Sequence, residues 1–402
     1  MSNQILNHFL MPITRRPEVI MVKGEGSYLW DNNGRRYLDF IQGWAVNSLG
    51  HCPEVVRRAI VEQSARLLTP SPALYNEPEL ELAELLSRAS GLAQVFFCNC
   101  GTEANESAIK LARKWGRLHR NDAYEIITAQ NAFHGRTLAS MAASGKPGWE
   151  SLFPPPMPGF IKVPFGNAEV VESVITAKTV AVMIEPIQGE AGVVIPPDGY
   201  LQRLRQITKR HDLLLIVDEI QTGMGRTGAA FCHQFEGIQA DIMTLGKGLG
   251  GGVPIAAMLA SEKASCFSYG EQGGTYNGNP LMTAVALAVS RVVLQPDFIA
   301  RVGSTGRYLL ERLKQLANRH ECPEIRGRGL LAALRLPGEY AEEVRDRCFE
   351  HGLLINAPRP NLLRFMPALN VTIQEVDKLI EIVEESLNDL ARFKGPIALS
   401  QK

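Results

Sequence analysis

The sequence predicts an α/β protein built on a mainly parallel central sheet with helices on its faces. Three segments carry this prediction: residues 95–98, 180–184 and 213–217. Each is a short apolar run that ends on polar residues and leads into a glycine-containing loop or a helical stretch. Apolar runs of this length, separated by helical stretches, are typical of buried parallel strands. Ligands of such sheets bind beyond the carboxyl ends of the strands, so the polar residues that close these runs are candidate site residues.

The two ends of the chain predict a second, smaller α+β region. The segment EGSYLWDNNGRRYLDF predicts a hairpin with its turn at residues 32–34. The last part of the chain alternates amphipathic helices with short strands. The expected helices are residues 281–294, 307–319 and 373–390, and the expected strands are residues 329–336, 353–356 and 362–366. We therefore expect an N-terminal segment (1–50) that packs with a small C-terminal domain (291–402), and a large domain between them (51–290).

Composition excludes several kinds of partner. The chain has 402 residues, 45% of them hydrophobic, with 42 basic and 42 acidic side chains. A balanced charge argues against binding to nucleic acid or to an anionic membrane. We read no signal peptide at the N-terminus, and no stretch approaches the ~20 apolar residues of a membrane-spanning helix. Seven cysteines, without a second Cys or His pair beside Cys98 and Cys100, predict reduced thiols in a cytoplasmic protein and no metal site.

Lys247 stands in the glycine-rich stretch TLGKGLGGG. A phosphate-binding Walker loop requires Ser or Thr after the lysine, and glycine follows Lys247 instead. A second interpretation is a lysine that forms a Schiff base with a flat cofactor, for which glycines allow close backbone approach. A third is a flexible surface loop with a solvated lysine. Lys247 is a candidate catalytic residue whose role depends on its partners.

Asp218 directly follows the apolar run LLLIV, which places it at the end of a buried strand. A buried carboxylate needs a partner. A protonated pyridine nitrogen would suit it, because the pair keeps that nitrogen positive and makes the ring an electron sink. The alternative is a strand-end aspartate that caps the following helix, and this feature alone does not separate the two.

Gly101 and Thr102 open a segment with apolar residues at helical spacing. The N-terminus of such a helix offers free backbone N–H groups and the positive end of the helix dipole, which suit a phosphate. Glycine allows close approach, and the Thr102 hydroxyl can add a hydrogen bond. A plain N-cap explains Thr102 equally well at this level.

Further candidates lie in three short motifs. In FHGRT, Phe133 could stack on a cofactor, and Arg136 could bind a substrate carboxylate in fork geometry. Alternatively, Phe133 is ordinary core, and its neighbour His134 a structural histidine. EPIQGE supplies a strand-end acidic pair that ends in Glu190. In LLLRFMPALN, Arg364 interrupts an apolar run, so it needs an anionic ligand or a buried salt bridge between domains.

The order and spacing of these motifs resemble the class III aminotransferases of the pyridoxal-phosphate (PLP) fold type I, across nearly the whole chain. The matching blocks are GEGSYLWDNNGRRYLDF, FCNCGTEANESAIKLARKW, FHGRT, EPIQGE, IVDEIQTGMGRTG, DIMTLGKGLGGGVPIAAM, GGTYNGNP and LLRFMPALNV. Within that group the chain is most similar to the acetylornithine aminotransferases. The resemblance implies a large domain with a mainly parallel sheet, plus a smaller domain from both chain ends.

The resemblance also implies how PLP is held. Lys247 would carry it as a Schiff base, Asp218 would pair with the pyridine nitrogen, and Gln221 would bond the ring oxygen. Phe133 would stack on the ring. Gly101 and Thr102 would bind the phosphate. Thr275 of GGTY would reach the phosphate in the neighbouring subunit, which implies a homodimer.

For the substrate, the resemblance implies two carboxylate-binding arginines, Arg136 and Arg364. Arg364 would pair with Glu190 as a gate, bound for the amine substrate and freed for 2-oxoglutarate or glutamate. Gly274 stands where relatives often have Ser or Thr, which weakens one expected substrate contact. Two more departures are Cys100, where serine is common before Gly-Thr, and Trp44, where a smaller residue is common.

The expected reaction moves the side-chain amine of N2-acetylornithine to 2-oxoglutarate, giving N-acetylglutamate 5-semialdehyde and glutamate, in arginine biosynthesis. Gly43 favours this substrate, because ornithine aminotransferases tend to carry a tyrosine nearby that reads a free α-amino group. Alternatives are another ω-aminotransferase, acting on succinylornithine, ornithine, 4-aminobutyrate or a diamine, or an aminomutase, which needs no external keto acid. A third alternative is a non-catalytic PLP-binding or regulatory protein, which would have no use for the full set Lys247, Asp218, Gln221 and Arg364.

Overall fold

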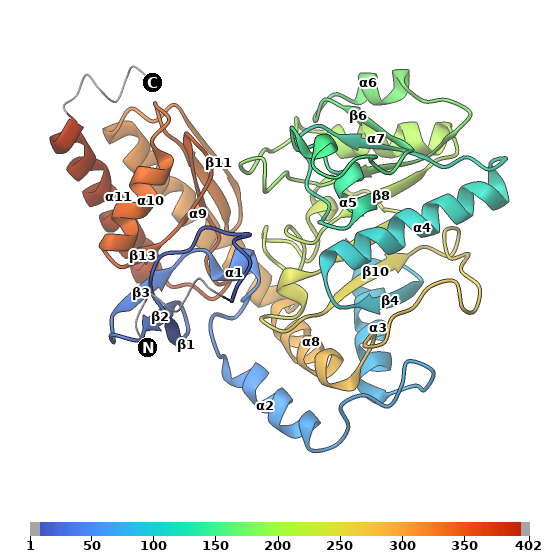
Figure 1. Cartoon of the computed structure of the whole chain (residues 1–402), viewed down its shortest axis with the longest axis horizontal. Coiled ribbons are helices and arrows are strands. Elements are labelled where there is room, and N and C mark those ends of the chain that lie inside the picture. The colour runs from blue at the N-terminus through green and yellow to red at the C-terminus, as the bar shows by residue number, and fades with distance from the viewer. Residues whose placement is uncertain (1–8, 395–402) are drawn as a thin grey trace.

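The fold has a large lobe around one twisted sheet and a small lobe assembled from both ends of the chain, in a computed structural model that describes residues 9–394 (Figure 1). Residues 1–8 and 395–402, the outermost parts of the expected N-terminal segment and small domain, lie outside the described residues, as does the start of the region in which we read no signal peptide. The large sheet has seven strands. In spatial order they are β4 (Gln94–Cys98), β10 (Ala256–Ala260), β9 (Ile242–Leu245), β8 (Leu214–Asp218), β7 (Thr179–Ile184), β5 (Glu125–Ala129) and β6 (Phe160–Val163).

The large sheet is mainly parallel, as the sequence predicts. The pairs β9–β8, β8–β7, β7–β5 and β5–β6 are parallel, and β10 runs antiparallel to both β4 and β9. The predicted runs at residues 95–98, 180–184 and 213–217 fall on β4, β7 and β8. Their carboxyl ends therefore lie at one edge of the sheet, together with those of β5 and β9.

Side chains alternate between the two faces of this sheet. Ile126, Met183 and Ile216 pack on one face with α4 (Gly101–His119) and α5 (Leu138–Ala143). Val182 and Val217 pack on the other face with α6 (Ala168–Ser173) and α7 (Tyr200–Arg210). Burial on both faces explains why β7 and β8 read as continuous apolar runs rather than as alternating patterns.

The small lobe contains two further four-stranded sheets. One has the order β11 (Glu324–Arg328), β12 (Leu331–Arg335), β15 (Leu362–Phe365) and β14 (Asn356–Arg359). The other has the order β1 (Met21–Glu25), β2 (Tyr28–Asp31), β3 (Arg36–Asp39) and β13 (Leu353–Leu354). The predicted hairpin is β2–β3, and β13 joins it by pairing parallel to β3. This pairing places the N-terminal strands beside the C-terminal lobe, as Figure 1 shows in blue and red.

One expected helix boundary in the small lobe is wrong. The helix expected over residues 307–319 begins at Pro296, as α9 (Pro296–Arg319). Gly303 and Gly306 interrupt its apolar periodicity, which concealed the first part of the helix. The strand expected over residues 353–356 is divided at Ile355 into β13 and β14.

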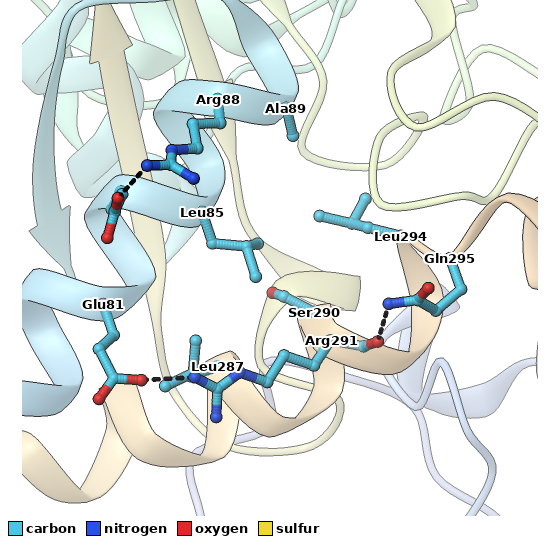
Figure 2. Close-up of a pocket in the computed structure, with 10 residues that line it drawn as sticks. Glu81, Leu85, Arg88, Ala89, Leu287, Ser290, Arg291, Leu294 and Gln295 are labelled. Carbon is cyan, nitrogen blue, oxygen red and sulfur yellow. Dashed lines mark hydrogen bonds and ion pairs between the residues drawn. The ribbon is translucent and has the colours of Figure 1, made fainter.

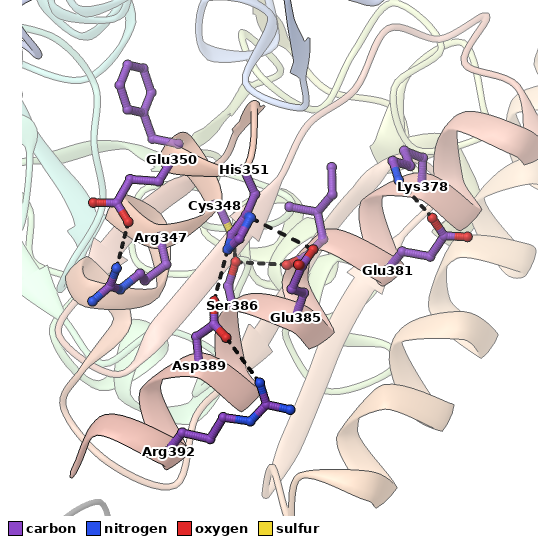
Figure 3. Close-up of polar contacts among 12 residues, drawn as sticks. Arg347, Cys348, Glu350, His351, Lys378, Glu381, Glu385, Ser386, Asp389 and Arg392 are labelled. Carbon is purple, nitrogen blue, oxygen red and sulfur yellow. Dashed lines mark hydrogen bonds and ion pairs between the residues drawn. The ribbon is translucent and has the colours of Figure 1, made fainter.

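Helices α10 (Ala341–Glu350) and α11 (Ile373–Lys394) pack together on the outside of the small lobe (Figure 3). At their contact the Cys348 thiol lies 3.3 Å from the Ser386 hydroxyl, and His351 Nε2 lies 3.1 Å from Asp389 Oδ2. Buried apolar side chains of both helices belong to the same core as α9.

The predicted boundary after residue 290 falls inside α8 (Pro280–Val293), which packs on α2 (Glu54–Ser64) and α3 (Glu77–Ser90). The three-part division stays a prediction, and these contacts favour a boundary near Leu294, between α8 and α9. In the part of the chain that the structure describes, no single helix has the length and apolarity to cross a membrane; α8 and α9, bent by 69° at their break, meet the criterion only when joined.

Gly306 lies where α9 touches the β11–β12 turn, and it provides a test of this packing. A Cβ at Gly306 would lie 2.3 Å from the carbonyl oxygen of Gly329, whereas a Cβ at Gly303 on the same helix would meet only Arg307 Nη1 at 3.7 Å. Gly306→Ala should lower the free energy of unfolding by about 1–3 kcal/mol, through overpacking. Gly303→Ala should leave it unchanged or raise it by up to about 1 kcal/mol, through helix propensity. Urea unfolding of both variants measures the difference, and equal effects would contradict the close contact.

Candidate active site

A cavity of about 230 Å³ opens at the carboxyl edge of the large sheet. Its lining includes eight of the eleven residues predicted from the sequence: Gly101, Thr102, Phe133, Arg136, Glu190, Asp218, Gln221 and Lys247. They come from segments that follow β4, β5, β7, β8 and β9. The shared edge of the parallel strands therefore brings together side chains that are up to about 150 residues apart in the sequence.

Lys247 is the first residue after the loop that follows β9, in the short 3₁₀ turn η4 (Lys247–Leu249). Its φ of 44° is a left-handed conformation that is unusual for a residue with a side chain. Gly248 is required beside it, because a Cβ there would lie 2.7 Å from Ser48 Oγ. Burial lowers the pKa of the Lys247 amine, although Glu190 and Asp218 oppose the shift. A larger share of the amine is therefore neutral and able to act as a nucleophile or base.

Asp218 closes β8 with its carboxylate buried. Oδ2 accepts hydrogen bonds from Asn105 Nδ2 and from His134 Nδ1, both at 2.8 Å. Oδ1 accepts one from the backbone N–H of Ile220 at 3.1 Å, a contact of the kind expected from the capping alternative. Asn105 is itself held by the Thr244 hydroxyl, which donates to its Oδ1 at 2.8 Å. This network fixes the carboxylate at the cavity wall.

Asn105 and His134 are site residues that the sequence did not single out. His134 is almost fully buried, and its Nε2 has no hydrogen-bond partner in the described part of the protein. Asn105 lies one helical turn after Gly101 on the inner face of α4. Spacing carried a signal for Asn105, since residues i and i+4 share a helix face. His134 was considered only as a structural histidine, and its contact with Asp218 depends on the loop after β5 folding back.

The N-terminus of α4 faces the cavity, as predicted for an anion site. Its N-cap is Cys100, whose side chain makes no capping hydrogen bond, so the alternative of Thr102 as the N-cap is wrong. Thr102 Oγ1 lies 3.2 Å from the Arg136 N–H and 3.3 Å from the Thr137 N–H and accepts from both. Since both lone pairs are engaged, its own proton is free to donate to the Ser140 hydroxyl at 2.7 Å or to a ligand.

Two apolar side chains and a carboxyl group complete the walls. Phe133 and Ile220 line the cavity, and the Phe133 N–H donates to Glu185 Oε2 at 3.1 Å. Burial raises the pKa of Glu185 well above its ordinary value, and nearby Asp218 adds to this shift. Burial therefore shifts Glu185 toward its neutral, protonated form.

Gln221 has an unused donor at the cavity wall. Its Nε2 is buried without a partner among the described residues. Its Oε1 lies so close to Gly189 that a Cβ at that position would be 1.6 Å away. A buried amide group with a free donor is costly unless a ligand accepts from it, so Gln221 suits an acceptor oxygen in the cavity.

Arg364 reaches the same region from β15 of the small lobe and is fully buried. Its Nη2 lies 2.8 Å from Glu190 Oε1, and its Nη1 donates to the Gly189 carbonyl at 2.7 Å. Although burial opposes ionisation, Arg364 and Lys247 keep the pKa of Glu190 below its ordinary value. The guanidinium also lies 5.7 Å from the ring of Trp44, the bulky residue that departs from relatives. The predicted Arg364–Glu190 ion pair is therefore present.

Thr275 and Gly274 lie away from this cavity. Both are exposed, in the loop between β10 and α8, and Thr275 adjoins residues 69–71 instead. A Cβ at Gly274 would lie 2.7 Å from Asn277 Nδ2, so a side chain there would require Asn277 to shift. Another hollow, of about 640 Å³, lies between α3 and α8 (Figure 2). Its rim carries the ion pair Glu81–Arg291 and none of the predicted site residues.

The sequence of the chain also matches a known protein family. Residues 12–387 match the family model of the class III aminotransferases. The chain belongs to this family. It is 52% identical over 375 residues to acetylornithine aminotransferase 2 of Bordetella bronchiseptica, covering 92% of this chain and 95% of that protein. It is 51% identical to the acetylornithine aminotransferase of Ralstonia nicotianae, covering 94% and 96%.

Two solved structures support the family at the level of fold. The N-acetylornithine aminotransferase of Stenotrophomonas maltophilia has a TM-score of 0.82 at 36% identity, covering 93% of this chain and 97% of that one. The ornithine aminotransferase of Toxoplasma gondii has a TM-score of 0.91 at 31% identity, covering 96% and 94%. The chain thus has the predicted PLP fold type I and is a PLP-dependent transaminase that acts on an amine and a keto acid.

The residues present fit PLP. The cavity offers a buried amine at Lys247, a hydrogen-bonded carboxylate at Asp218, the N–H groups of the α4 N-terminus and the unused donor of Gln221. These groups match an aldehyde, a pyridine nitrogen, a phosphate and a ring hydroxyl.

Gly135 provides a test of the phosphate end. Its φ is 137°, and a Cβ there would lie 2.2 Å from Thr102 Oγ1 and 2.6 Å from Ser140 Oγ. Gly135→Ala should displace Thr102 and weaken PLP binding at least about 10-fold, a loss comparable to that of one charge-assisted hydrogen bond. Gly199→Ala is the matched control, because Gly199 also has a positive φ (78°) but no atom within 4 Å of the added Cβ. Absorbance titration with PLP measures both, and equal affinities would contradict the assignment.

Proposed function

We propose that this enzyme transfers the side-chain amino group of N2-acetylornithine to 2-oxoglutarate, in arginine biosynthesis. The observation that carries the proposal is the pair of arginines at the cavity: Arg364 is closed by Glu190, whereas Arg136 lines the cavity without an ion pair to any described residue. Arg136 is always available to a carboxylate, whereas Arg364 becomes available only when Glu190 releases it. Such a pair suits an amine that has one carboxylate and a keto acid that has two. The names of the relatives support the same substrate.

PLP, when bound, supplies an electron sink that stabilises negative charge on the substrate carbon. Lys247 would hold it covalently and, once released by the incoming amine, would accept and return the proton at its Nζ. Its burial and lowered pKa favour the neutral amine that this proton transfer requires. Asp218 would keep the pyridine nitrogen protonated, with Asn105 and His134 holding its carboxylate in position.

The other predicted contacts follow from the lining of the cavity. Phe133 would stack on the cofactor ring, with Ile220 as a further apolar wall, and Gln221 would donate to the ring oxygen. Gly101 and Thr102 would bind the phosphate through the α4 N-terminus and the Thr102 hydroxyl.

Substrate binding would use the arginines in turn. Arg136 would bind the α-carboxylate of acetylornithine and the distal carboxylate of 2-oxoglutarate. Arg364 would leave Glu190 only for the α-carboxylate of the keto acid or of glutamate. Gly43, with a left-handed φ of 61°, has no polar side chain that could bind a free α-amino group, which suits an acylated α-nitrogen.

We also propose a homodimer in which Thr275 reaches the phosphate of the partner's cofactor. Support comes from the position of Thr275, exposed and outside its own cavity, beside a segment with large exposed apolar side chains at Leu68, Leu74 and Tyr75. A cytoplasmic location would keep the seven free cysteines reduced.

A substrate panel tests the reaction. Purified protein with PLP should form glutamate from acetylornithine and 2-oxoglutarate faster than from ornithine, 4-aminobutyrate, putrescine or succinylornithine. Lys247→Ala should lower turnover at least about 1000-fold, because it removes the group that moves the proton. Faster turnover of another amine would overturn the substrate but not the class. Amine isomerisation without a keto acid would indicate an aminomutase, and full activity of Lys247→Ala would contradict the mechanism.

The gate gives a separate prediction. Glu190→Gln removes the charge that holds Arg364, so the KM for 2-oxoglutarate should fall, while kcat/KM for acetylornithine should fall about 5- to 30-fold because an unpaired cation now faces the amine substrate. Single-turnover measurements of each half-reaction separate the two effects. Glu81→Gln, which breaks the surface pair with Arg291, is the control. Equal changes in both half-reactions would contradict the gate.

A further inference from the structure

Trp149 lies just outside the active-site cavity and contacts two residues that line it. The ring is nearly buried, with 9% of the residue exposed, in the short turn η2 (Trp149–Ser151). Its centre lies 5.7 Å from that of Phe133, at an interplanar angle of 68°. The Arg136 guanidinium carbon lies 4.9 Å from the centre of the same indole. On its other side, Trp149 borders a separate hollow of about 330 Å³.

Arg136 needs an external support to present its guanidinium in a fixed direction. It is exposed, and no carboxylate in residues 9–394 forms an ion pair with it. A long side chain in this position samples many rotamers, and each carboxylate that it binds must offset the loss of that freedom. An indole face within 6 Å attracts a guanidinium and restricts its motion before the substrate arrives.

An aromatic partner has a consequence that an acidic partner would not have. Glu190 neutralises Arg364 and must be displaced before that arginine can bind a carboxylate. Trp149 orients Arg136 but carries no charge, so it does not compete with a carboxylate for the guanidinium. Lys146, whose Nζ lies 5.2 Å from the centre of the indole, adds a second cation at this ring.

We propose that Trp149 is a positioning residue for the carboxylate that lies far from the reacting centre of the substrate: it holds Arg136 by cation–π stacking and leaves its charge free. This inference rests on the proposed function for the identity of the amine, but not for the existence of the carboxylate site. Trp149 also packs against Phe133, the residue proposed to stack on the cofactor. Loss of Trp149 should therefore weaken cofactor binding, but by less than it weakens carboxylate binding.

The test compares two amines that differ only in the carboxylate. N-acetylputrescine is acetylornithine without its α-carboxylate. Trp149→Leu, which keeps an apolar side chain, should lower kcat/KM for acetylornithine about 5- to 30-fold, the range expected from a cation–π contact of intermediate burial. It should change kcat/KM for N-acetylputrescine less than about 2-fold. Trp149→Phe, which retains a ring, should lie between Trp149→Leu and the unchanged enzyme and guards against a folding defect in Trp149→Leu.

A double variant and a control complete the design. Arg136→Met should remove the preference for acetylornithine, and adding Trp149→Leu should cost little more, because both act on one interaction. Trp115→Phe is the matched control: Trp115 is buried, carries Lys263 4.8 Å from its ring centre and does not line the cavity. It should leave the ratio of the two amines unchanged.

The outcomes separate this inference from the proposed function. If Trp149→Leu keeps the full preference for acetylornithine over N-acetylputrescine, or if its loss adds to that of Arg136→Met, the inference is wrong. If the unchanged enzyme does not use acetylornithine, the proposed function fails, and the comparison is made in the second half-reaction with 2-oxoglutarate and 2-oxovalerate, which lacks the distal carboxylate. A selective loss on 2-oxoglutarate then supports the role of Trp149, and an equal loss on both keto acids overturns it.

Discussion

The site depends on one buried amine and on the charges placed around it. Lys247 is held inside the protein in a left-handed backbone conformation, where burial lowers its pKa and the carboxylates of Glu190 and Asp218 limit that shift. Each nearby acid is kept in a different condition. Burial raises the pKa of Glu185, Glu190 is paired with Arg364, and Asp218 is hydrogen-bonded to Asn105 and His134. Burial therefore lowers the pKa of the lysine even though three acids lie nearby.

The two arginines show two physical ways to prepare a guanidinium. Arg364 is fully buried, and a cation there requires a carboxylate and carbonyl groups as partners. Arg136 is exposed, so water already solvates its charge and a neutral aromatic face is enough to orient it. The difference in burial thus leaves Arg364 paired with Glu190 beside the cavity and Arg136, in the cavity wall, without an ion pair to any described residue.

The small lobe is tied to the cofactor side of the large lobe through Arg226. This buried arginine follows Gln221 by five residues, and its Nη1 donates to the Leu330 and Pro367 carbonyls at 3.2 and 2.5 Å. Pro367 lies just beyond β15, the strand that carries Arg364. Arg226 therefore joins the segment after Gln221 to the segment that follows the Arg364 strand.

The sequence alone predicted the mainly parallel sheet, the helix that begins near Gly101 and the candidate residues Lys247 and Asp218, because apolar run length, glycines and strand-end acids are local signals. It did not determine where α9 begins or that Cys100, not Thr102, caps α4. Only the tertiary structure decided that Asn105 and His134 hold Asp218, that Trp149 supports Arg136 and that Thr275 lies outside its own cavity. These contacts join loops from different strands, and local composition carries no record of how such loops fold back. The sequence thus named the candidate site residues, while packing decided which neighbours surround them.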